Sequence, residues 1–259
     1  MGQEIKKSAL IGYTGFVGRN ILRAGAMIDE KYSSTNIADI RGKEFDLLIC
    51  AGTRGSRRGV NENPNGDLEE IKSLMEQLKR VKVDKLVLIS TVEVYNYHNR
   101  ADEDYDLPKD MLPPYALHRY YLEEFCRTRF DYLIVRLPII FGVGLKKNII
   151  YDLLKGHYNF THKDNIYQFY DLANIWNDIQ KSIQLDIKIV NLFSEPIAVR
   201  ELAWDVFHIE LTNTDEPLRQ FDILCKYWRL WNGVPGYLYS KRDIYSSLEK
   251  YIADRSLLS

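Results

Sequence analysis

The sequence predicts a doubly wound α/β fold, in which helices cover both faces of a parallel sheet, and three observations indicate it. Four short apolar runs, at 8–12, 45–52, 84–91 and 131–138, have the length and continuity of strands buried on both faces. Amphipathic stretches with helical spacing separate these runs. The resulting alternation of strand and helix is typical of this architecture.

Helices are expected over 18–27, 66–82 and 115–130. Asp67 followed by Glu70 predicts a capping box at the start of the second helix. The stretch between the second apolar run and this helix, residues 53–66, is rich in glycine and asparagine and is expected to form a loop.

Composition narrows the classes of function. The 259 residues include 35 basic and 36 acidic side chains, and a formal charge of −1 offers no basic surface to a nucleic acid. Cys50, Cys126 and Cys225 are far apart in sequence and are expected to be reduced core residues. No secretory signal or membrane-length apolar run is evident. We therefore expect a cytoplasmic protein with no nucleic acid or membrane partner.

Gly12, Gly15 and Gly18 stand between the first apolar run and the first helix, which is the context in which a glycine run binds a dinucleotide. Gly12 is expected to take a positive φ, Gly15 to give phosphates access to the backbone, and Gly18 to let helix and strand pack closely. The helix N-terminus would then face the diphosphate. A glycine-rich turn without a ligand is the alternative.

If the second strand ends near Tyr32, Ser33 or Ser34 meets the adenosine ribose, and the absence of a carboxylate there favours NADP over NAD. Asp29 or Glu30 would favour NAD if the strand is shorter. The residues expected to contact the cofactor are Gly12, Thr14, Gly15, Phe16, Val17, Gly18, Arg19, Ser33, Ser34, Asn36, Ala51, Gly52 and Pro138.

Tyr115 and Arg119 are four residues apart on a predicted helix, so both lie on one face. A cation beside a phenol favours phenolate, and Arg119 is therefore expected to lower the pKa of Tyr115 from about 10 towards neutrality. Thr91, at the end of a predicted strand, is placed to polarise a substrate oxygen. The alternative is an ordinary helical Tyr–Arg pair and a strand that ends in a hydroxyl residue.

The other charged groups give weaker signals. Arg54, Arg57 and Arg58 follow a predicted strand end. They are expected either to bind a cofactor or substrate phosphate or to form a solvated basic loop. The five histidines lack metal-ligand spacing, so no metal is expected. His118 is expected to point around the helix from Tyr115 and Arg119.

Taken together, these stretches resemble an extended short-chain dehydrogenase/reductase of the NAD(P)-dependent epimerase/dehydratase type. The glycine triplet resembles that family's dinucleotide motif, Thr91 precedes Tyr95 as the family's catalytic hydroxyl residue does, and Tyr115 to Arg119 resembles its Tyr-x-x-x-Lys motif. Later stretches continue the resemblance in the same order: "RLPIIFG" (136–142), "YQFYDLANI" (167–175) and "VNLFSEPIAVRELA" (190–203).

The chain departs from the family's pattern at several positions. Arg119 replaces the lysine; it keeps the charge but does not pass on a proton. Ile139 and Phe141 replace an asparagine and a tyrosine. Val92 replaces the aspartate that follows the catalytic threonine in dehydratases, which argues against a 4,6-dehydration. The chain thus resembles an atypical branch that carries Tyr-x-x-x-Arg.

The resemblance implies an NAD(P)-dependent oxidoreductase, reductase or epimerase that acts on a nucleotide sugar, in polysaccharide or surface-glycan biosynthesis. Thr91, Tyr115 and Arg119 would be its catalytic residues, and 67–82 with 115–130 would pair two copies as a homodimer. A non-catalytic dinucleotide-binding sensor or partner subunit is the alternative, favoured by Arg119 and Ile139. A pocket that holds no dinucleotide is a third, weaker reading.

The resemblance also implies a domain organisation. A Rossmann-type domain covers 1–138, and strands from about 165–195 return to it. Residues 139–164 and 196–259 form a small C-terminal substrate-binding subdomain. Aromatic residues are frequent in the last forty positions; they line a substrate site or simply form the core of that subdomain.

Overall fold

The computed structural model describes residues 6–53, 57–96 and 99–254. The chain forms two units, each assembled from segments that are distant in sequence. The first unit comprises residues 1–96, 106–136 and 173–190, and the second comprises 97–105, 137–172 and 191–259.

A six-stranded parallel sheet forms the centre of the first unit, in the order β2-β1-β3-β4-β5-β9. Its strands are β1 (Ser8–Ile11), β2 (Glu30–Tyr32), β3 (Glu44–Cys50), β4 (Lys82–Thr91), β5 (Tyr132–Leu137) and β9 (Ile189–Asn191). The four apolar runs are therefore β1, β3, β4 and β5, and their interior residues are almost all buried. This burial explains why the runs are continuously apolar rather than alternating.

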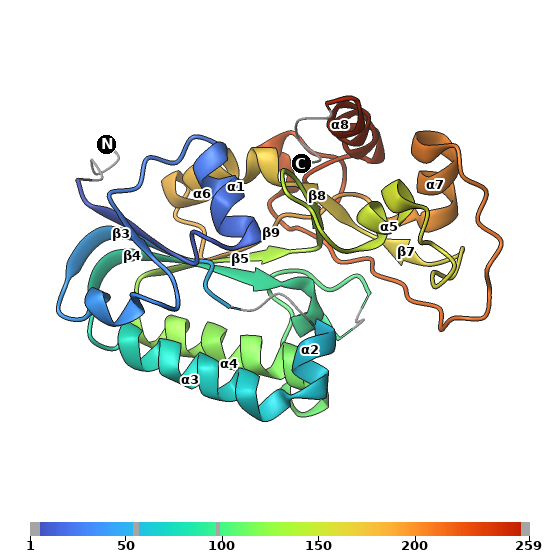
Figure 1. The fold of residues 1–259 in the computed structure, drawn as a ribbon. Coiled ribbons are helices and arrows are strands. Elements are labelled where there is room, and N and C mark those ends of the chain that lie inside the picture. The colour runs from blue at the N-terminus through green and yellow to red at the C-terminus, as the bar shows by residue number, and fades with distance from the viewer. Residues whose placement is uncertain (1–5, 54–56, 97–98, 255–259) are drawn as a thin grey trace. The chain divides into compact units, whose positions relative to one another are not determined.

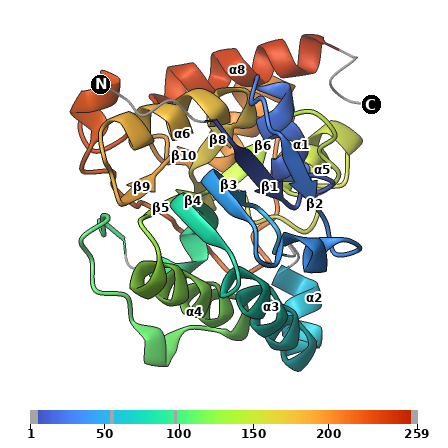
Figure 2. The same cartoon turned by 90° about the vertical axis from the view of Figure 1, so that its left-hand side faces the viewer.

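Helices cover both faces of this sheet, as a doubly wound fold requires (Figures 1 and 2). α1 (Phe16–Arg23) and α6 (Ile175–Gln184) lie on one face, and α3 (Pro64–Leu78) and α4 (Pro114–Arg129) lie on the other. The core beneath α3 and α4 is apolar; Ile71, Leu122 and Cys126 pack there against strand residues such as Leu88 and Ile134.

The loop expected over 53–66 is partly helical. α2 (Arg57–Glu62) forms within it, and α3 begins at Pro64, earlier than predicted. Asn63 is the N-cap residue of α3; its side chain accepts a hydrogen bond from the backbone N–H of Gly66. The capping box predicted for Asp67 is therefore wrong, because Pro64 at the first helical position starts the helix one turn earlier.

The second unit contains two small two-stranded sheets. β6 (Ile139–Phe141) pairs in parallel with β8 (Phe169–Asp171), and β7 (Ile166–Tyr167) pairs antiparallel with β10 (Ile197–Ala198). Of the strands expected to return to the central sheet between about 165 and 195, β9 joins it, whereas β7 and β8 pair within the second unit. The buried Gln168 stands between β7 and β8, and its side chain bonds to backbone groups of this unit.

Three helices complete the second unit: α5 (Ile149–Lys155), α7 (Val199–Phe207) and α8 (Lys241–Ala253). α8 lies in the aromatic-rich C-terminal region and buries Ile244, Leu248 and Tyr251 on one side. The ring centroid of Tyr251 lies 5.8 Å from that of Phe141, so this tyrosine belongs to the core.

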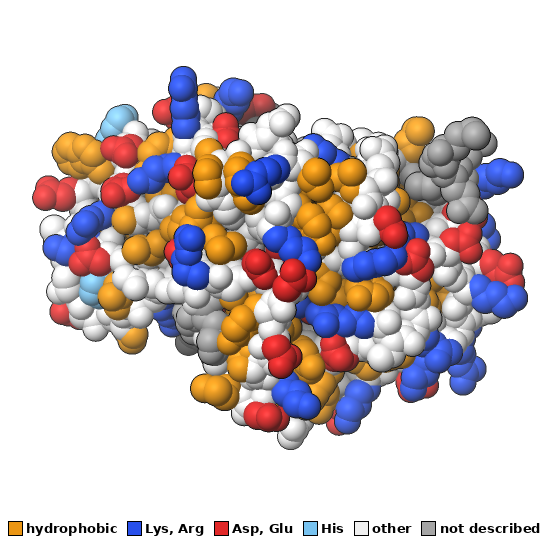
Figure 3. All heavy atoms as spheres, turned by 180° about the vertical axis from the view of Figure 1, so that it is seen from behind, with side chains coloured by type: hydrophobic (Ala, Val, Ile, Leu, Met, Phe, Trp, Pro, Cys, Tyr) orange, Lys and Arg blue, Asp and Glu red, His pale blue; other side chains and the backbone are white. Residues whose placement is uncertain are grey.

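Figure 3 shows basic and acidic side chains interspersed over one face of the molecule. Within the described ranges, no helix combines the length and the apolar character needed to cross a membrane.

Candidate functional site

The backbone packing requires two of the three glycines in the first turn. Gly12 follows β1 with φ +84°, and a Cβ built on it would lie 2.4 Å from the carbonyl oxygen of Ala51. A Cβ on Gly18 would lie 2.2 Å from the carbonyl oxygen of Gly12. These distances are far below van der Waals contact, so neither position accepts a side chain without moving the backbone. α1 packs against the turn as closely as the sequence predicts.

Gly15 differs from its two neighbours. It is exposed, and its φ of −75° and ψ of 170° suit any residue. The nearest atom to a Cβ built there would be the carbonyl oxygen of Gly12, at 3.2 Å. The protein's own packing therefore gives much less reason for glycine here than at Gly12 or Gly18. Its missing side chain leaves the backbone at the start of α1 accessible.

The start of α1 has the character of an anion site. The helix begins at Phe16, and Gly15 at the N-cap has no side chain with which to cap the first turn. A first helical turn presents N–H groups without intrahelical partners and a partial positive charge. Thr14 and Arg19 are exposed beside this turn, and Phe16 and Val17 are half-buried.

The second strand ends at Tyr32, as the NADP interpretation assumes. Asn36 Oδ1 accepts a hydrogen bond from the backbone N–H of Ser33 at 2.7 Å, and Asn36 Nδ2 donates to the carbonyl oxygen of Lys31 at 3.1 Å. These bonds close a turn after β2, in which Ser34 is exposed.

The two carboxylates near β2 bind protein groups instead. Asp29 accepts hydrogen bonds from the backbone N–H and the hydroxyl of Ser8, at 2.7 and 2.8 Å. Glu30 pairs with Lys43 at 2.6 Å, and that hydrogen bond is the main reason why the pKa of Glu30 is lowered to about 2. Neither residue stands at the carboxyl end of the strand.

Ala51 and Gly52 follow β3 and lie beside the end of β1. The Ala51 N–H donates to the carbonyl oxygen of Ile11 at 3.0 Å, and a Cβ on Gly52 would lie 2.7 Å from Ile11 Cγ2. Both therefore border the glycine turn. Pro138 directly follows β5 and belongs to the second unit.

The three predicted catalytic residues lie together at the carboxyl end of β4. Tyr115 is in the first turn of α4, and the Cζ of Arg119 lies 4.3 Å from the centroid of its ring. The two side chains share one helix face, as the four-residue spacing predicts. Thr91, the last residue of β4, hydrogen-bonds to the Tyr115 side chain.

The pKa of Tyr115 is raised above its ordinary value, contrary to the expectation from sequence. Burial is the largest cause, because it disfavours the phenolate, and the carboxylates of Glu93 and Asp67 act in the same direction. Arg119 and the hydrogen bond from Thr91 oppose these effects but do not overcome them. The phenol is accordingly protonated at neutral pH.

Asp67 completes this cluster, although its sequence context suggests only a helix cap. It lies in the first turn of α3, and its Oδ2 accepts a hydrogen bond from Arg119 Nη1 at 2.5 Å. His118 Nδ1 lies 2.7 Å from the same oxygen. The expectation that His118 points away from Arg119 is wrong, because both side chains converge on one carboxylate. All three side chains are 3–7% exposed.

Glu93 stands near Tyr115 on the 3₁₀ turn Val92–Tyr95 and is paired with a cation. Arg57 Nη1 of α2 lies 2.9 Å from Glu93 Oε1, and the two side chains are 35% and 17% exposed. Arg57 therefore contacts a protein carboxylate at the carboxyl end of β4. Arg54 and the side chain of Arg58 lie outside the described residues.

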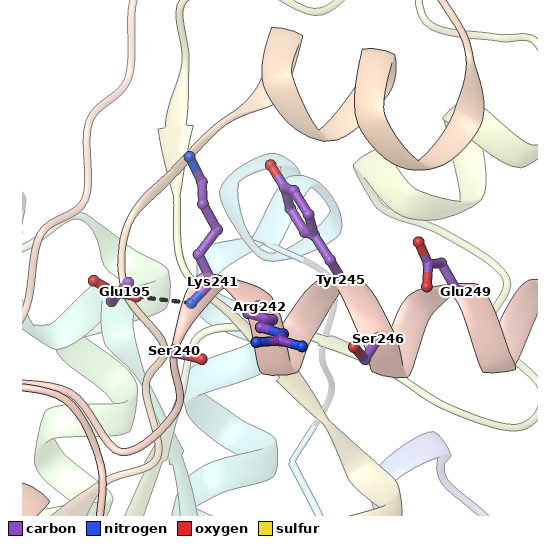
Figure 4. A pocket seen from close by; sticks show the side chains of 7 residues that line it. All are labelled: Glu195, Ser240, Lys241, Arg242, Tyr245, Ser246 and Glu249. Carbon is purple, nitrogen blue, oxygen red and sulfur yellow. Dashed lines mark hydrogen bonds between the residues drawn. The ribbon is translucent and has the colours of Figure 1, made fainter.

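A separate groove of about 540 Å³ lies in the second unit, along the first turns of α8 (Figure 4). Lys241 and Tyr245 project to the same side of this helix, and the Lys241 backbone N–H donates to Glu195 Oε2 at 2.9 Å. A capping box of Ser240 and Asp243 satisfies the helix N-terminus. The groove contains none of the predicted cofactor or catalytic residues.

The models of known protein families give no match to this chain, and neither do the curated proteins. Solved structures do match. A dTDP-4-dehydrorhamnose reductase from Bacillus anthracis in complex with NADP has a TM-score of 0.74 and 16% identity, over 98% of this chain and 100% of that chain. The corresponding reductase from Clostridium acetobutylicum gives 0.70 and 16%, over 95% and 98%.

A UDP-N-acetylglucosamine 4-epimerase from Methanobrevibacter ruminantium, in complex with UDP-N-acetylmuramic acid, gives a TM-score of 0.75 and 15% identity, over 97% of this chain and 98% of that chain. At these identities the likeness shows the fold. The predicted Rossmann-type doubly wound fold is confirmed, and it is the fold that sugar-nucleotide reductases and epimerases share.

Proposed function

We propose that this chain is an NAD(P)-dependent oxidoreductase or epimerase of the extended short-chain dehydrogenase/reductase type, which acts on a nucleotide sugar with Tyr115 as general acid–base. One observation carries the proposal. Gly15 leaves the backbone accessible at the start of α1, although the packing demands a glycine there much less than at Gly12 or Gly18. A dinucleotide diphosphate seated on the helix start is a ligand that needs this space.

The topology supports a common site for the coenzyme and Tyr115. β1 pairs in parallel with β3, and β3 pairs in parallel with β4, so the carboxyl ends of these strands point the same way. The glycine turn follows β1, and Thr91 ends β4. Doubly wound proteins bind their ligands outside the carboxyl ends of the strands.

A nicotinamide coenzyme supplies the hydride chemistry when it is bound, and the residues of the chain bind it and move the proton. The first-turn amides of α1 hold the diphosphate, and Ala51 and Gly52 border the same space. Tyr115 exchanges its phenolic proton with the substrate oxygen. The hydrogen bond from Thr91 orients the phenol.

NADP is the proposed coenzyme rather than NAD. Ser34 is exposed in the turn after β2, and Arg19 is exposed on α1. Asp29 and Glu30 bind Ser8 and Lys43, and neither stands at the carboxyl end of β2, where a ribose 2′-hydroxyl would be met.

The proposed substrate class rests on the fold neighbours, which are by name a dTDP-linked sugar reductase and a UDP-sugar epimerase. A nucleoside-diphosphate sugar is therefore the proposed substrate, and polysaccharide or surface-glycan biosynthesis is the proposed setting.

Native mass spectrometry of the purified chain with NADPH and with NADH tests the proposal. We expect a one-to-one complex with each coenzyme and a larger bound fraction with NADPH at equal concentration. If neither complex forms at millimolar coenzyme, the proposal is wrong.

Gly15→Ala, matched with Gly18→Ala, tests the observation on which the proposal rests. Gly15→Ala should weaken NADPH binding by about tenfold, or about 1.4 kcal/mol, because the new methyl group lies where the diphosphate approaches. Its thermal unfolding should stay close to that of the wild type. Gly18→Ala should unfold at a clearly lower temperature, because its Cβ meets backbone. Unchanged NADPH affinity in Gly15→Ala would contradict the proposed seat of the diphosphate.

A non-catalytic dinucleotide-binding protein is the second candidate, and the contact between Arg119 and Asp67 favours it. An arginine held by a carboxylate does not relay protons as a lysine does. If the chain is a sensor, Arg119→Lys should retain coenzyme binding and gain no turnover. Measurable reduction of a nucleoside-diphosphate ketosugar by the wild type excludes this candidate.

A further inference from the structure

Tyr115 lies against a cation whose charge is already balanced. The Arg119 guanidinium stacks on the phenol ring, with Cζ 4.3 Å from the centroid. Its Nη1 donates to Asp67 Oδ2 from the neighbouring helix α3. Both members of this ion pair are almost fully buried, at 3% and 4% exposure, so water screens them little. The phenol therefore faces a fixed pair of opposite charges rather than a single free cation.

A second arginine–carboxylate pair lies near the phenol in the described part of the chain. Glu93 of the 3₁₀ turn after β4 carries a negative charge near Tyr115, and Arg57 of α2 pairs with it at 2.9 Å. His118 of α4 shares Asp67 Oδ2 with Arg119. Among the described residues, the two arginines near Tyr115, Arg119 and Arg57, thus each contact a carboxylate.

We propose that Asp67 is a positioning residue that acts through Arg119: it fixes and balances the guanidinium so that Tyr115 stays a proton donor, and the site reduces a carbonyl group of a nucleoside-diphosphate ketosugar. This inference rests on the proposed function and deepens it by choosing the direction of the reaction. An epimerase or an alcohol oxidase begins by removing a proton from a substrate hydroxyl, which requires the phenolate at neutral pH.

The reducing step balances in atoms and electrons. The carbonyl carbon receives a hydride from the reduced nicotinamide coenzyme, which is oxidised, and the carbonyl oxygen receives the phenolic proton of Tyr115. The C=O bond becomes CH–OH. The Tyr115 phenolate then takes a proton from water, because desolvation at this partly buried position disfavours the phenolate.

The titration of Tyr115 in the coenzyme-free protein tests this inference without turnover. The chain has 18 tyrosines, so the protein is labelled with ¹³C at tyrosine Cζ, and the Tyr115 signal is the one missing from Tyr115→Phe. Asp67→Asn removes the negative charge while its amide oxygen still accepts from Arg119. Glu69→Gln is the matched control, because it makes the same change of charge at an exposed position of α3.

We expect Tyr115 to ionise at lower pH in Asp67→Asn than in Glu69→Gln, because the negative charge of Asp67 no longer offsets the positive charge of Arg119. Arg119→Met should move the ionisation to higher pH, and Arg119→Lys, which keeps the charge, should reverse most of that shift. The two Arg119 variants test the same coupling if Asp67→Asn folds poorly. Equal Tyr115 titration in Asp67→Asn and the control, or in Arg119→Met and the wild type, overturns the inference.

A separate rate measurement tests the assigned direction of the reaction. NADPH and a UDP-4-ketosugar serve as the probe. As the pH is raised, the rate of reduction should begin to decrease at a lower pH in Asp67→Asn than in Glu69→Gln, because Tyr115 loses its proton earlier. At neutral pH the wild type should reduce the ketone faster than it oxidises the corresponding alcohol with NADP⁺. Faster oxidation would overturn the assigned direction. Failure of coenzyme binding would instead overturn the proposed function, and the titration of Tyr115 would still report on Asp67.

Discussion

Two buried arginine–carboxylate pairs lie along α4, and each arginine stacks on a tyrosine. At the start of the helix, Arg119 pairs with Asp67 and lies 4.3 Å from the ring centroid of Tyr115. One turn later, Glu123 pairs with Arg136 of β5 at 2.7 Å, and Arg136 lies 4.8 Å from the ring centroid of Tyr95.

The two tyrosines differ in what their hydroxyls do. The Tyr95 hydroxyl accepts a hydrogen bond from Arg136 Nη1 at 2.7 Å, and the side chain is fully buried. The Tyr115 hydroxyl bonds to the small Thr91 side chain at the open end of the sheet, and Tyr115 is only partly buried. The same pairing of residues thus encloses one tyrosine in the core and leaves the other partly exposed one turn earlier in the helix.

Removing each hydroxyl in turn gives the largest expected effect. Tyr115→Phe should reduce turnover by about 100- to 10,000-fold, the usual contribution of a general acid–base, while NADPH binding is retained. Tyr95→Phe is the matched control and should keep the turnover of the folded protein. Steady-state rates and NADPH titrations of both variants check this, and normal turnover in Tyr115→Phe would remove the proposed mechanism.

Removing the charge of Glu123 should show that the Glu123–Arg136 pair stabilises the folded protein. Glu123→Gln should cost about 3–5 kcal/mol in the free energy of unfolding, because the buried Arg136 loses its counter-charge. Ser90 also donates to Glu123, so the loss spreads to β4. Glu124→Gln is the control; its pair with Arg127 is 41% and 28% exposed and should contribute no more than about 1 kcal/mol. Urea unfolding of both variants measures the difference.

The smallest expected effect sharpens the contrast between the hydroxyls. Tyr95→Phe should lower the free energy of unfolding by about 1–3 kcal/mol, because a buried N–H of Arg136 loses its acceptor. Tyr115→Phe should lower it by less, since Thr91 is partly exposed and water can replace the lost bond. Equal destabilisation in urea unfolding would mean that the two hydroxyls play the same role.

Much of the fold was predictable because it follows from local patterns. β1, β3, β4 and β5 are continuous apolar runs, and their ends lie within two residues of the predicted bounds. α2, α5, α6 and α8 were not predicted. α2 has only six residues, and α8 buries Ile244, Leu248 and Tyr251 as a narrow stripe among charged residues. Such a stripe gives a weak periodic signal.

The site was predictable where its signal is local and not where it depends on packing. The glycine turn, the end of β2 at Tyr32 and the Tyr115–Arg119 spacing are each contained in a short stretch. Asp67 lies 52 residues from Arg119 and meets it only because α3 packs beside α4. The direction of the Tyr115 pKa shift depends on that packing too, since burial is its main cause.

The contact between Asp67 and Arg119 also constrains how this protein can change. Substituting lysine at position 119 by itself leaves a carboxylate in the interior facing a shorter cation with a different shape. Substituting position 67 by itself removes the carboxylate that the Arg119 guanidinium contacts. The effect of an exchange at either position therefore depends on the residue at the other. Attempts to engineer or evolve a lysine-type centre in this scaffold should test the two positions, on different helices, together.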